Sequence, residues 1–151
     1  MKTILLQGTF LTLLAMNSFA QNDPQDIQVK LNHIAISVTD LQESEQFYRD
    51  IIGLEQIPEP FNVGRHAWFN IGQGSLHVIK ASEERVEHNK SNHLCFSVGD
   101  LDGFMKKLSS HGVEYADFAG NTGEINLRPD GVRQIYFTDP DGHWIEVNDE
   151  F

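Results

Sequence analysis

Residues 32–41 read NHIAISVTDL, and residues 92–101 read NHLCFSVGDL. The two segments are identical at six of ten positions, and most of the other positions exchange one apolar residue for another. Repetition of this quality at an offset of 60 residues indicates that the chain contains two copies of one structural module.

Each copy of the repeat is followed by a segment with helical features. Asp40 and Asp100 stand near the end of the repeated segments and carry the short carboxylate that caps helix N-termini. Gly53 and Gly112 follow the apolar residues of these two segments, at positions where glycine commonly ends a helix. The sequence therefore predicts one helix in each half, with strand-like sequence resuming at 54–55 and 113–114.

The end of each half has the pattern of a β-hairpin. The turn segments GQG (72–74) and DPDG (139–142) are rich in the residues that hairpin turns favour. These turns differ by one residue, and with the hairpins aligned the offset is 69, which places His77 opposite Glu146. The predicted strands are 65–71 and 75–81 in the first half, and 133–138 and 143–147 in the second.

The two halves together predict an α+β domain. Each half has the element order βαβββ, and the modules are assigned to residues 31–82 and 92–149 within a domain of residues 31–151. A module of this size buries too little apolar surface to be stable alone, so the two should share one core. We expect an open, curved, eight-stranded mixed sheet around a metal site. Whether the modules pair within one chain or between two chains is left open by the sequence.

Strand alternation places four potential metal ligands on one face. Successive side chains of a strand point to opposite faces, and the apolar positions 34, 36 and 38 define the face that packs against a helix. Three imidazoles and one carboxylate suit a borderline divalent metal. A histidine on a strand is more often a hydrogen-bonded structural residue, but the recurrence of one histidine at the same repeat position favours the metal site. The potential ligands are His33, His77, His93 and Glu146.

These motifs resemble the vicinal oxygen chelate superfamily. The segments NHIAISV and NHLCFSV and the closing segment FTDPDGHWIEV (137–147) carry the resemblance, which covers residues 31–148. The superfamily includes glyoxalase I, extradiol dioxygenases, fosfomycin-resistance proteins and bleomycin-resistance proteins, and the chain also resembles its glyoxalase-like branch. The resemblance implies one divalent metal ion (Zn, Ni, Co, Mn or Fe), a small-molecule substrate and a homodimer. His33, His77, His93 and Glu146 match the four metal-ligand positions of the superfamily.

The resemblance further implies an enzyme whose substrate chelates the metal through its oxygens. Glu146 is the candidate catalytic residue, as a metal-bound general base in proton transfer of the isomerase or lyase type. Glyoxalase I usually has Glu or Gln at the position of His77, so its second carboxylate is missing here. The alternatives are a thiol transferase of the fosfomycin-resistance type, an Fe(II) extradiol dioxygenase, and a non-catalytic binding or resistance protein.

Three further side chains are candidates for substrate binding. Arg133 and Arg65 are expected near the mouth of the pocket, where a guanidinium can hold a carboxylate or a phosphonate. Trp68 is expected to line the pocket, with core packing as an equal alternative. The histidines without a repeat partner, including His66, are interpreted as surface or turn residues.

The first twenty residues have the composition of a signal peptide. Lys2 precedes an apolar run over residues 4–16, and Ser18 and Ala20 are the small residues expected before a cleavage site. We therefore predict a signal peptide at 1–20 and an N-terminal extension at 21–30. The mature protein is expected to be periplasmic or secreted, without membrane attachment.

Charge and cysteine content narrow the possible partners and the metal chemistry. The net charge of −11 opposes binding to phosphate backbones, so nucleic acid is not an expected partner. Cys95 is the only cysteine, which excludes intramolecular disulfides and zinc sites built from paired cysteines. A bound metal must therefore be held by histidine and carboxylate.

Overall fold

The computed structural model describes residues 28–81 and 84–151. The chain divides into residues 1–30 and a compact unit of residues 31–151, and the described helices and strands belong to the second unit. The predicted signal peptide and most of the predicted extension lie outside the described residues. Among the described helices, none has the length and apolar character needed to cross a membrane.

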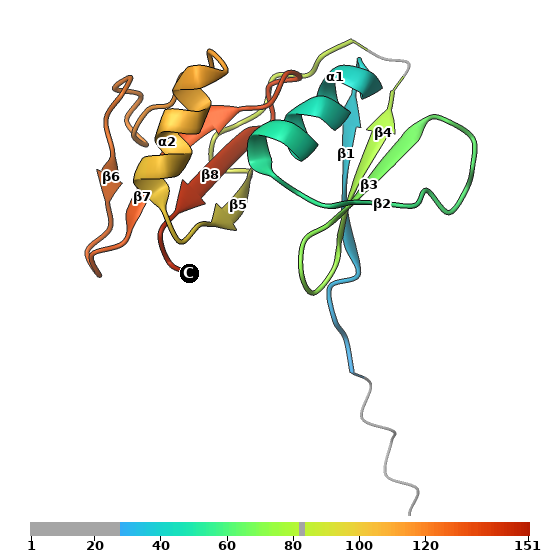
Figure 1. Cartoon of the computed structure of the whole chain (residues 1–151), viewed down its shortest axis with the longest axis horizontal. Helices are drawn as coiled ribbons and strands as arrows, with labels where there is room; N and C mark the ends of the chain where they lie inside the picture. The colour runs from blue at the N-terminus through green and yellow to red at the C-terminus, as the bar shows by residue number, and fades with distance from the viewer. Residues whose placement is uncertain (1–27, 82–83) are drawn as a thin grey trace, which may run out of the picture. The chain divides into compact units, whose positions relative to one another are not determined.

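The first module forms a four-stranded sheet with one helical region (Figure 1). The helical region consists of α1 (Leu41–Gln46) and the π-helical η1 (Phe47–Ile52). The strand order is β1-β4-β3-β2, with β1 parallel to β4 and the other neighbours antiparallel. The strands are β1 (His33–Val38), β2 (Gln56–Ile57), β3 (His66–Asn70) and β4 (Ser75–Lys80).

The second module repeats this topology. Its helix is α2 (Leu101–Ser110), and its strand order is β5-β8-β7-β6, with β5 parallel to β8. Near the strand predicted at 113–114 the structure has two isolated bridges, from Ala116 to Thr122 and to Tyr136, and the fourth strand is β6 instead. The strands are β5 (His93–Ser97), β6 (Asn126–Leu127), β7 (Arg133–Thr138) and β8 (Trp144–Asn148).

The strand register confirms the internal repeat. Ala35 in β1 lies opposite His77 in β4, and their repeat partners Cys95 and Glu146 lie opposite each other in β5 and β8. The two modules therefore share their pairing register as well as the order of their elements.

The helix boundaries confirm the predicted caps. The side chains of Asp40 and Asp100 each accept hydrogen bonds from backbone N–H groups in the first helical turn. Gly53 and Gly112 adopt φ angles of 91° and 70° at the ends of the helical regions. An L-amino acid with a side chain is strained in this left-handed conformation, which explains why glycine ends both.

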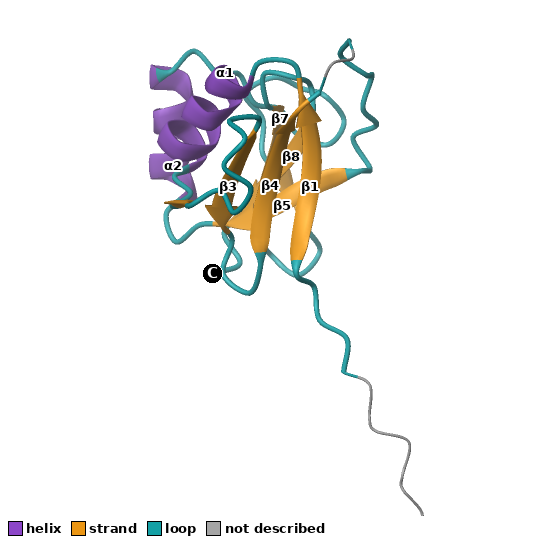
Figure 2. Cartoon of the chain, turned by 90° about the vertical axis from the view of Figure 1, so that its right-hand side faces the viewer, coloured by secondary structure: helices purple, strands orange, loops and turns teal. Residues whose placement is uncertain are grey.

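Both helices lie on the same side of the strands, as Figure 2 shows. The strand faces predicted to be apolar are the ones that pack against them: Leu76 and Val78 in β4 and Ile145 and Val147 in β8 are almost fully buried in one core. The opposite faces, which carry the candidate ligands, are free of this packing.

The strands form two four-stranded sheets, so the expected eight-stranded sheet is not formed within one chain. In the described part of the chain, no pairing joins β1 to β5, and both are edge strands. The modules contact each other elsewhere: Tyr48 donates a hydrogen bond of 2.8 Å to Asp139, and Thr39 donates two to Asp141 at 2.7 and 2.9 Å. These contacts join η1 and Thr39, which follows β1, to the turn before β8.

Candidate metal centre

One half of the candidate site lies on the second sheet. His93 and Glu146 come from neighbouring strands, and His93 Nε2 lies 3.2 Å from a carboxylate oxygen of Glu146. His93 Nδ1 lies 2.8 Å from the backbone carbonyl of Lys90, which can only accept, so Nδ1 carries a proton. In the neutral imidazole the Nε2 lone pair then faces the carboxylate, and this arrangement is favourable only with a proton or a metal cation between them.

The Glu146 carboxylate is buried and held by neutral donors. Burial raises the pKa of Glu146, but hydrogen bonds from the surrounding donors outweigh this effect and leave the pKa lowered. Glu146 is therefore an anion at neutral pH, which is the state required of a metal ligand. The donors and their distances are Tyr136 at 2.7 Å, Asn148 at 3.1 Å, Cys95 at 3.3 Å and Gln134 at 2.6 Å.

The thiol of Cys95 is a hydrogen-bond donor in this site. Loss of solvent around the sulfur, together with the hydrogen bond to Glu146, raises the pKa of Cys95 to about 12. The thiol therefore stays protonated at neutral pH and donates to Glu146.

The other half of the site lies on the first sheet. The rings of His33 and His77 have centroids 5.9 Å apart, and His33 Nδ1 lies 2.8 Å from the side-chain oxygen of Asn32, which leaves His33 Nε2 free. Burial and the neighbouring His66 and His33 lower the pKa of His77, so its ring is neutral at neutral pH, as a metal ligand must be. His77 Nε2 lies 2.7 Å from His66 Nδ1, and metal binding through this nitrogen requires that hydrogen bond to break.

Trp68 covers the ring of His77. The two rings stack with centroids 4.0 Å apart and an interplanar angle of 16°. Trp68 Nε1 is buried and has no hydrogen-bond partner among the described residues. Such an unpaired, buried N–H is costly in a folded protein.

The structure brings the four candidate ligands together as two pairs. His33 and His77 lie on the first sheet, and His93 and Glu146 lie on the second. No group of three or more His, Cys, Asp or Glu side chains is arranged to hold a metal in residues 28–81 and 84–151. Since protein metal sites of this donor type use three or four ligands, neither pair alone provides enough ligands for such a site.

The candidate arginines are engaged in other contacts. Arg133 donates hydrogen bonds to Asp149 at 2.8 Å and to Asp102 at 3.0 Å, and Asp102 is in the first turn of α2. Arg65 precedes β3 and donates to the backbone carbonyl of Lys80. Lys90 lies beside the second half of the site: its Nζ lies 5.8 Å from the centroid of the Tyr136 ring and donates to the backbone carbonyls of Asp117 and Phe118.

Sequence reasoning did not identify four residues that surround the candidate ligands: His66, Lys90, Gln134 and Tyr136. Gln134 and Tyr136 alternate with the buried Ile135 in β7, so the alternation that placed Glu146 could also have placed them. His66 shares a strand face with Trp68 for the same reason. Lys90 lies in the linker between the modules, where no periodic pattern indicates the direction of a side chain.

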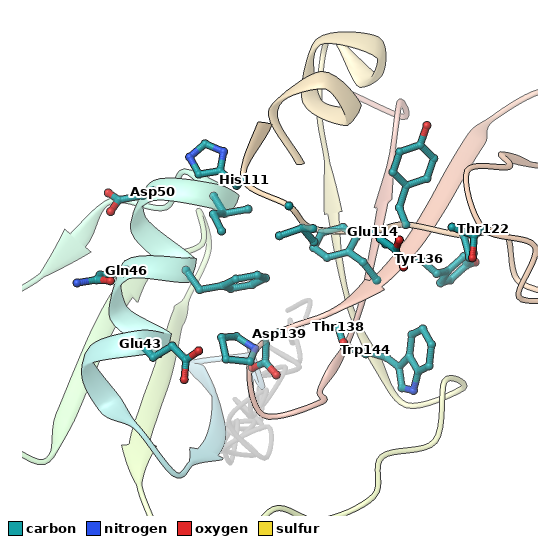
Figure 3. Close-up of a pocket in the computed structure, with 18 residues that line it drawn as sticks. Glu43, Gln46, Asp50, His111, Glu114, Thr122, Tyr136, Thr138, Asp139 and Trp144 are labelled. Atoms are coloured by element: carbon teal, nitrogen blue, oxygen red, sulfur yellow. The ribbon is translucent and has the colours of Figure 1, made fainter. Parts of the chain in front are cut away.

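A separate cleft of about 820 Å³ lies between the first helical region and the segment after α2 (Figure 3). Asp50, Gln46 and Glu43 line one of its walls, and Thr122 and Trp144 line the other. None of the four candidate ligands lines this cleft, although Tyr136, which donates to Glu146, does.

Three known proteins are informative relatives of this chain. "Glyoxylase I 4" of Arabidopsis thaliana is 28% identical over 124 residues, which cover 78% of this chain and 68% of the relative. "Metallothiol transferase FosB" of Staphylococcus epidermidis is 30% identical over 125 residues, covering 78% and 80%. The solved structure of "Oxidase ChaP-H2" is 31% identical with a TM-score of 0.69, covering 83% of this chain and 96% of that chain.

A family model identifies the chain as a whole. The model described as "Glyoxalase/Bleomycin resistance protein/Dioxygenase superfamily" matches residues 30–147, which include the first module, all but the last two residues of the second, and the four candidate ligands. The tandem repeat, its conserved register and this match agree, and the chain belongs to the glyoxalase/bleomycin resistance protein/dioxygenase superfamily.

Proposed function

We propose that the protein is a divalent-metal-dependent, glyoxalase-like enzyme whose small substrate chelates the metal through neighbouring oxygens. The observation that carries the proposal is the His93–Glu146 pair, in which Nε2 lies 3.2 Å from the carboxylate while the Nδ1 proton is committed to a backbone carbonyl. A cation between the two groups makes this arrangement favourable. The relatives named as a glyoxylase and a metallothiol transferase support the same class of protein.

We propose that two copies of the chain complete the site. Each chain carries two ligands on each of two separate sheets, and the edge strands β1 and β5 begin with His33 and His93. Approach of these open edges from two protomers joins His33 and His77 of one chain to the partner's His93 and Glu146. A homodimer of this kind holds two equivalent sites.

Proton transfer is assigned to Glu146. A bound divalent ion polarises substrate oxygens and stabilises the negative charge that develops on them. The donors around Glu146 lower its pKa, so loss of one of these hydrogen bonds makes the carboxylate more basic. Tyr136 remains protonated next to it, because burial and the Glu146 carboxylate raise the pKa of the Tyr136 hydroxyl.

A second candidate function is oxidation of a chelated substrate. Its supporting observation is the hydrogen bond between His66 and His77, which occupies the nitrogen that His77 would offer to a metal. With His77 held in this way, His33, His93 and Glu146 provide two histidines and one carboxylate, the ligand set of non-haem iron oxygenases. The similarity to a protein named as an oxidase agrees with this alternative.

The metal content of the purified chain tests the proposal. We expect stoichiometric divalent metal in the wild type by elemental analysis, and its loss in His93→Ala and in Glu146→Ala. His111→Ala, which changes an exposed histidine, is the matched control and should keep its metal. A metal-free wild type that still binds small molecules would favour the non-catalytic class of this superfamily instead.

A substrate panel then separates the reaction types. Adducts of α-oxoaldehydes with thiols test proton transfer, catechols test oxygenation, and an epoxide with a thiol tests group transfer. Turnover that is unchanged in Glu146→Ala would remove Glu146 as the base.

We also propose that the protein is exported. The support is the apolar run at 4–16 followed by Ser18 and Ala20. Mass spectrometry of protein from the periplasmic fraction should give a chain that begins at Gln21, and an uncleaved chain found only in the cytoplasm would contradict export.

A further inference from the structure

His66 is bonded to the candidate ligand His77, although it is not a candidate ligand itself. The two histidines belong to β3 and β4, the antiparallel strands of one hairpin. His66 Nδ1 lies 2.7 Å from His77 Nε2. One ring of such a pair donates a proton and the other accepts it through a lone pair. In either direction Nε2 of His77 is occupied and is not free to bind a metal.

Neighbouring aromatic rings hold both histidines in place. Trp68 stacks on His77 with ring centroids 4.0 Å apart, and His77 is only 7% exposed. The Phe61 ring lies 5.3 Å from the His66 ring and 6.2 Å from the His77 ring between centroids. The hydrogen bond therefore joins two side chains whose rings already pack against others.

The other two candidate histidines are prepared for a metal in the opposite way. His33 and His93 each have Nδ1 in a hydrogen bond of 2.8 Å, which leaves Nε2 to face a metal. A metal-ligating histidine usually has its other ring nitrogen engaged in this manner. In His77 the engaged nitrogen is Nε2. To reach as far from its strand as His33 and His93 do, His77 must use this nitrogen and give up its bond to His66.

We infer that His66 is a positioning residue that competes with the metal for Nε2 of His77 and so weakens the bond between His77 and the metal. This inference rests on the proposed function, because it needs a metal held by the four candidate ligands. Four protein ligands fill a tetrahedral site, whereas a substrate that chelates through two oxygens needs open positions. Because His77 has a hydrogen-bond partner to return to, it is the ligand that makes room for the substrate.

The affinity of the full-length protein for Zn²⁺ tests this competition. His66→Phe keeps a planar ring against Phe61 and removes both ring nitrogens. Since zinc no longer has to displace a hydrogen bond, we expect the Zn²⁺ dissociation constant, measured by competition with a chromophoric chelator, to fall about three- to tenfold. In the His77→Ala background the same change should have no effect, because the nitrogen for which His66 competes is gone. His111→Ala, which removes an exposed histidine, is the control and should leave the affinity unchanged.

Nuclear magnetic resonance gives a second readout that does not depend on affinity. In the isotope-labelled, metal-free protein, the hydrogen bond should give a scalar coupling between His66 Nδ1 and His77 Nε2. We expect this coupling to disappear when Zn²⁺ is added, because Nε2 of His77 then binds the metal.

The outcomes separate this inference from the proposed function. An unchanged dissociation constant in His66→Phe, or a coupling that persists in the zinc-bound protein, would mean that His77 does not bind zinc through Nε2. Weaker zinc binding in His66→Phe would make His66 a support of His77 and not a competitor. Each of these results overturns the inference and leaves the metal site standing. A wild type that binds no zinc would overturn the proposed function, and the inference with it.

Discussion

Hydrogen bonds from the surrounding donors keep the Glu146 carboxylate ionised, and the donor Tyr136 can be changed to test their effect on metal binding. Tyr136→Phe keeps the ring and removes a hydrogen bond of 2.7 Å to Glu146. Loss of a partner that orients a metal ligand typically weakens metal binding about 10–100-fold, so we expect a rise of that size in the dissociation constant. Competition with a chromophoric chelator measures it. Tyr115→Phe, outside the hydrogen bonds of Glu146, is the control, and equal affinity in all three proteins would contradict this role.

Tyr48 should make stability depend on pH in the alkaline range. Its hydroxyl donates to the buried Asp139, and burial together with that carboxylate raises the pKa of Tyr48 well above its usual value of about 10. The resulting stabilisation is complete below pH of about 10 and is lost as the pH rises from there toward the raised pKa. The free energy of unfolding in urea should therefore fall more steeply above that pH in the wild type than in Tyr48→Phe.

At neutral pH Tyr48→Phe should be less stable than the wild type by about 1–3 kcal/mol, because the buried Asp139 loses a donor. If the free energies of unfolding of the wild type and Tyr48→Phe changed in parallel with pH, Tyr48 would not be the cause of the alkaline loss of stability.

Single residues could be predicted from the sequence where a local pattern determined them. Strand alternation and the repeat were enough to bring His93 and Glu146 to one face of the second sheet. The hydrogen bond between His66 and His77 joins two strands across a hairpin, and neither residue type indicates it. The position of Lys90 beside Tyr136 depends on the path of a linker, which no local rule gives.

Among the elements, the hairpin between β3 and β4 lies against the residue before β1. A Cβ atom on Gly74 would lie 2.7 Å from the backbone oxygen of Asn32, which also accepts a hydrogen bond from Ser75 N–H. Gly74→Ala must therefore shift backbone, and we expect a loss of about 1–3 kcal/mol in the free energy of unfolding. Gly99→Ala, where the new methyl meets the Phe151 ring at 3.7 Å, is the control. Equal urea midpoints for the two variants would contradict the close approach.

The helices and long strands were predictable because their signals are local. The strand predicted at 133–138 is β7 with the same bounds, and the one predicted at 143–147 is β8 at 144–148. The short strand β6 was not predicted, because two residues give no alternation and its pairing with β7 depends on a loop.

In the molecule as a whole, the arrangement of the two sheets was beyond sequence reasoning. The hydrogen bonds that join the modules run from Tyr48 and Thr39 to the turn residues Asp139 and Asp141. All four are residue types common in helices and turns. Alternation identifies the face of a strand, but the partner of an edge strand depends on contacts far apart in the chain. The sequence therefore predicted the elements of each module, but it did not predict how the two sheets are arranged.

Co-expression of two complementary variants tests the proposed two-chain metal site most directly. The first variant, His33→Ala with His77→Ala, lacks the ligands of the first sheet, and the second, His93→Ala with Glu146→Ala, lacks those of the second sheet. Each variant alone should bind no metal. A mixed dimer, isolated through two different affinity tags, should contain one metal ion, because one of its two sites has all four ligands. A stable mixed dimer without metal would contradict a site shared between two chains.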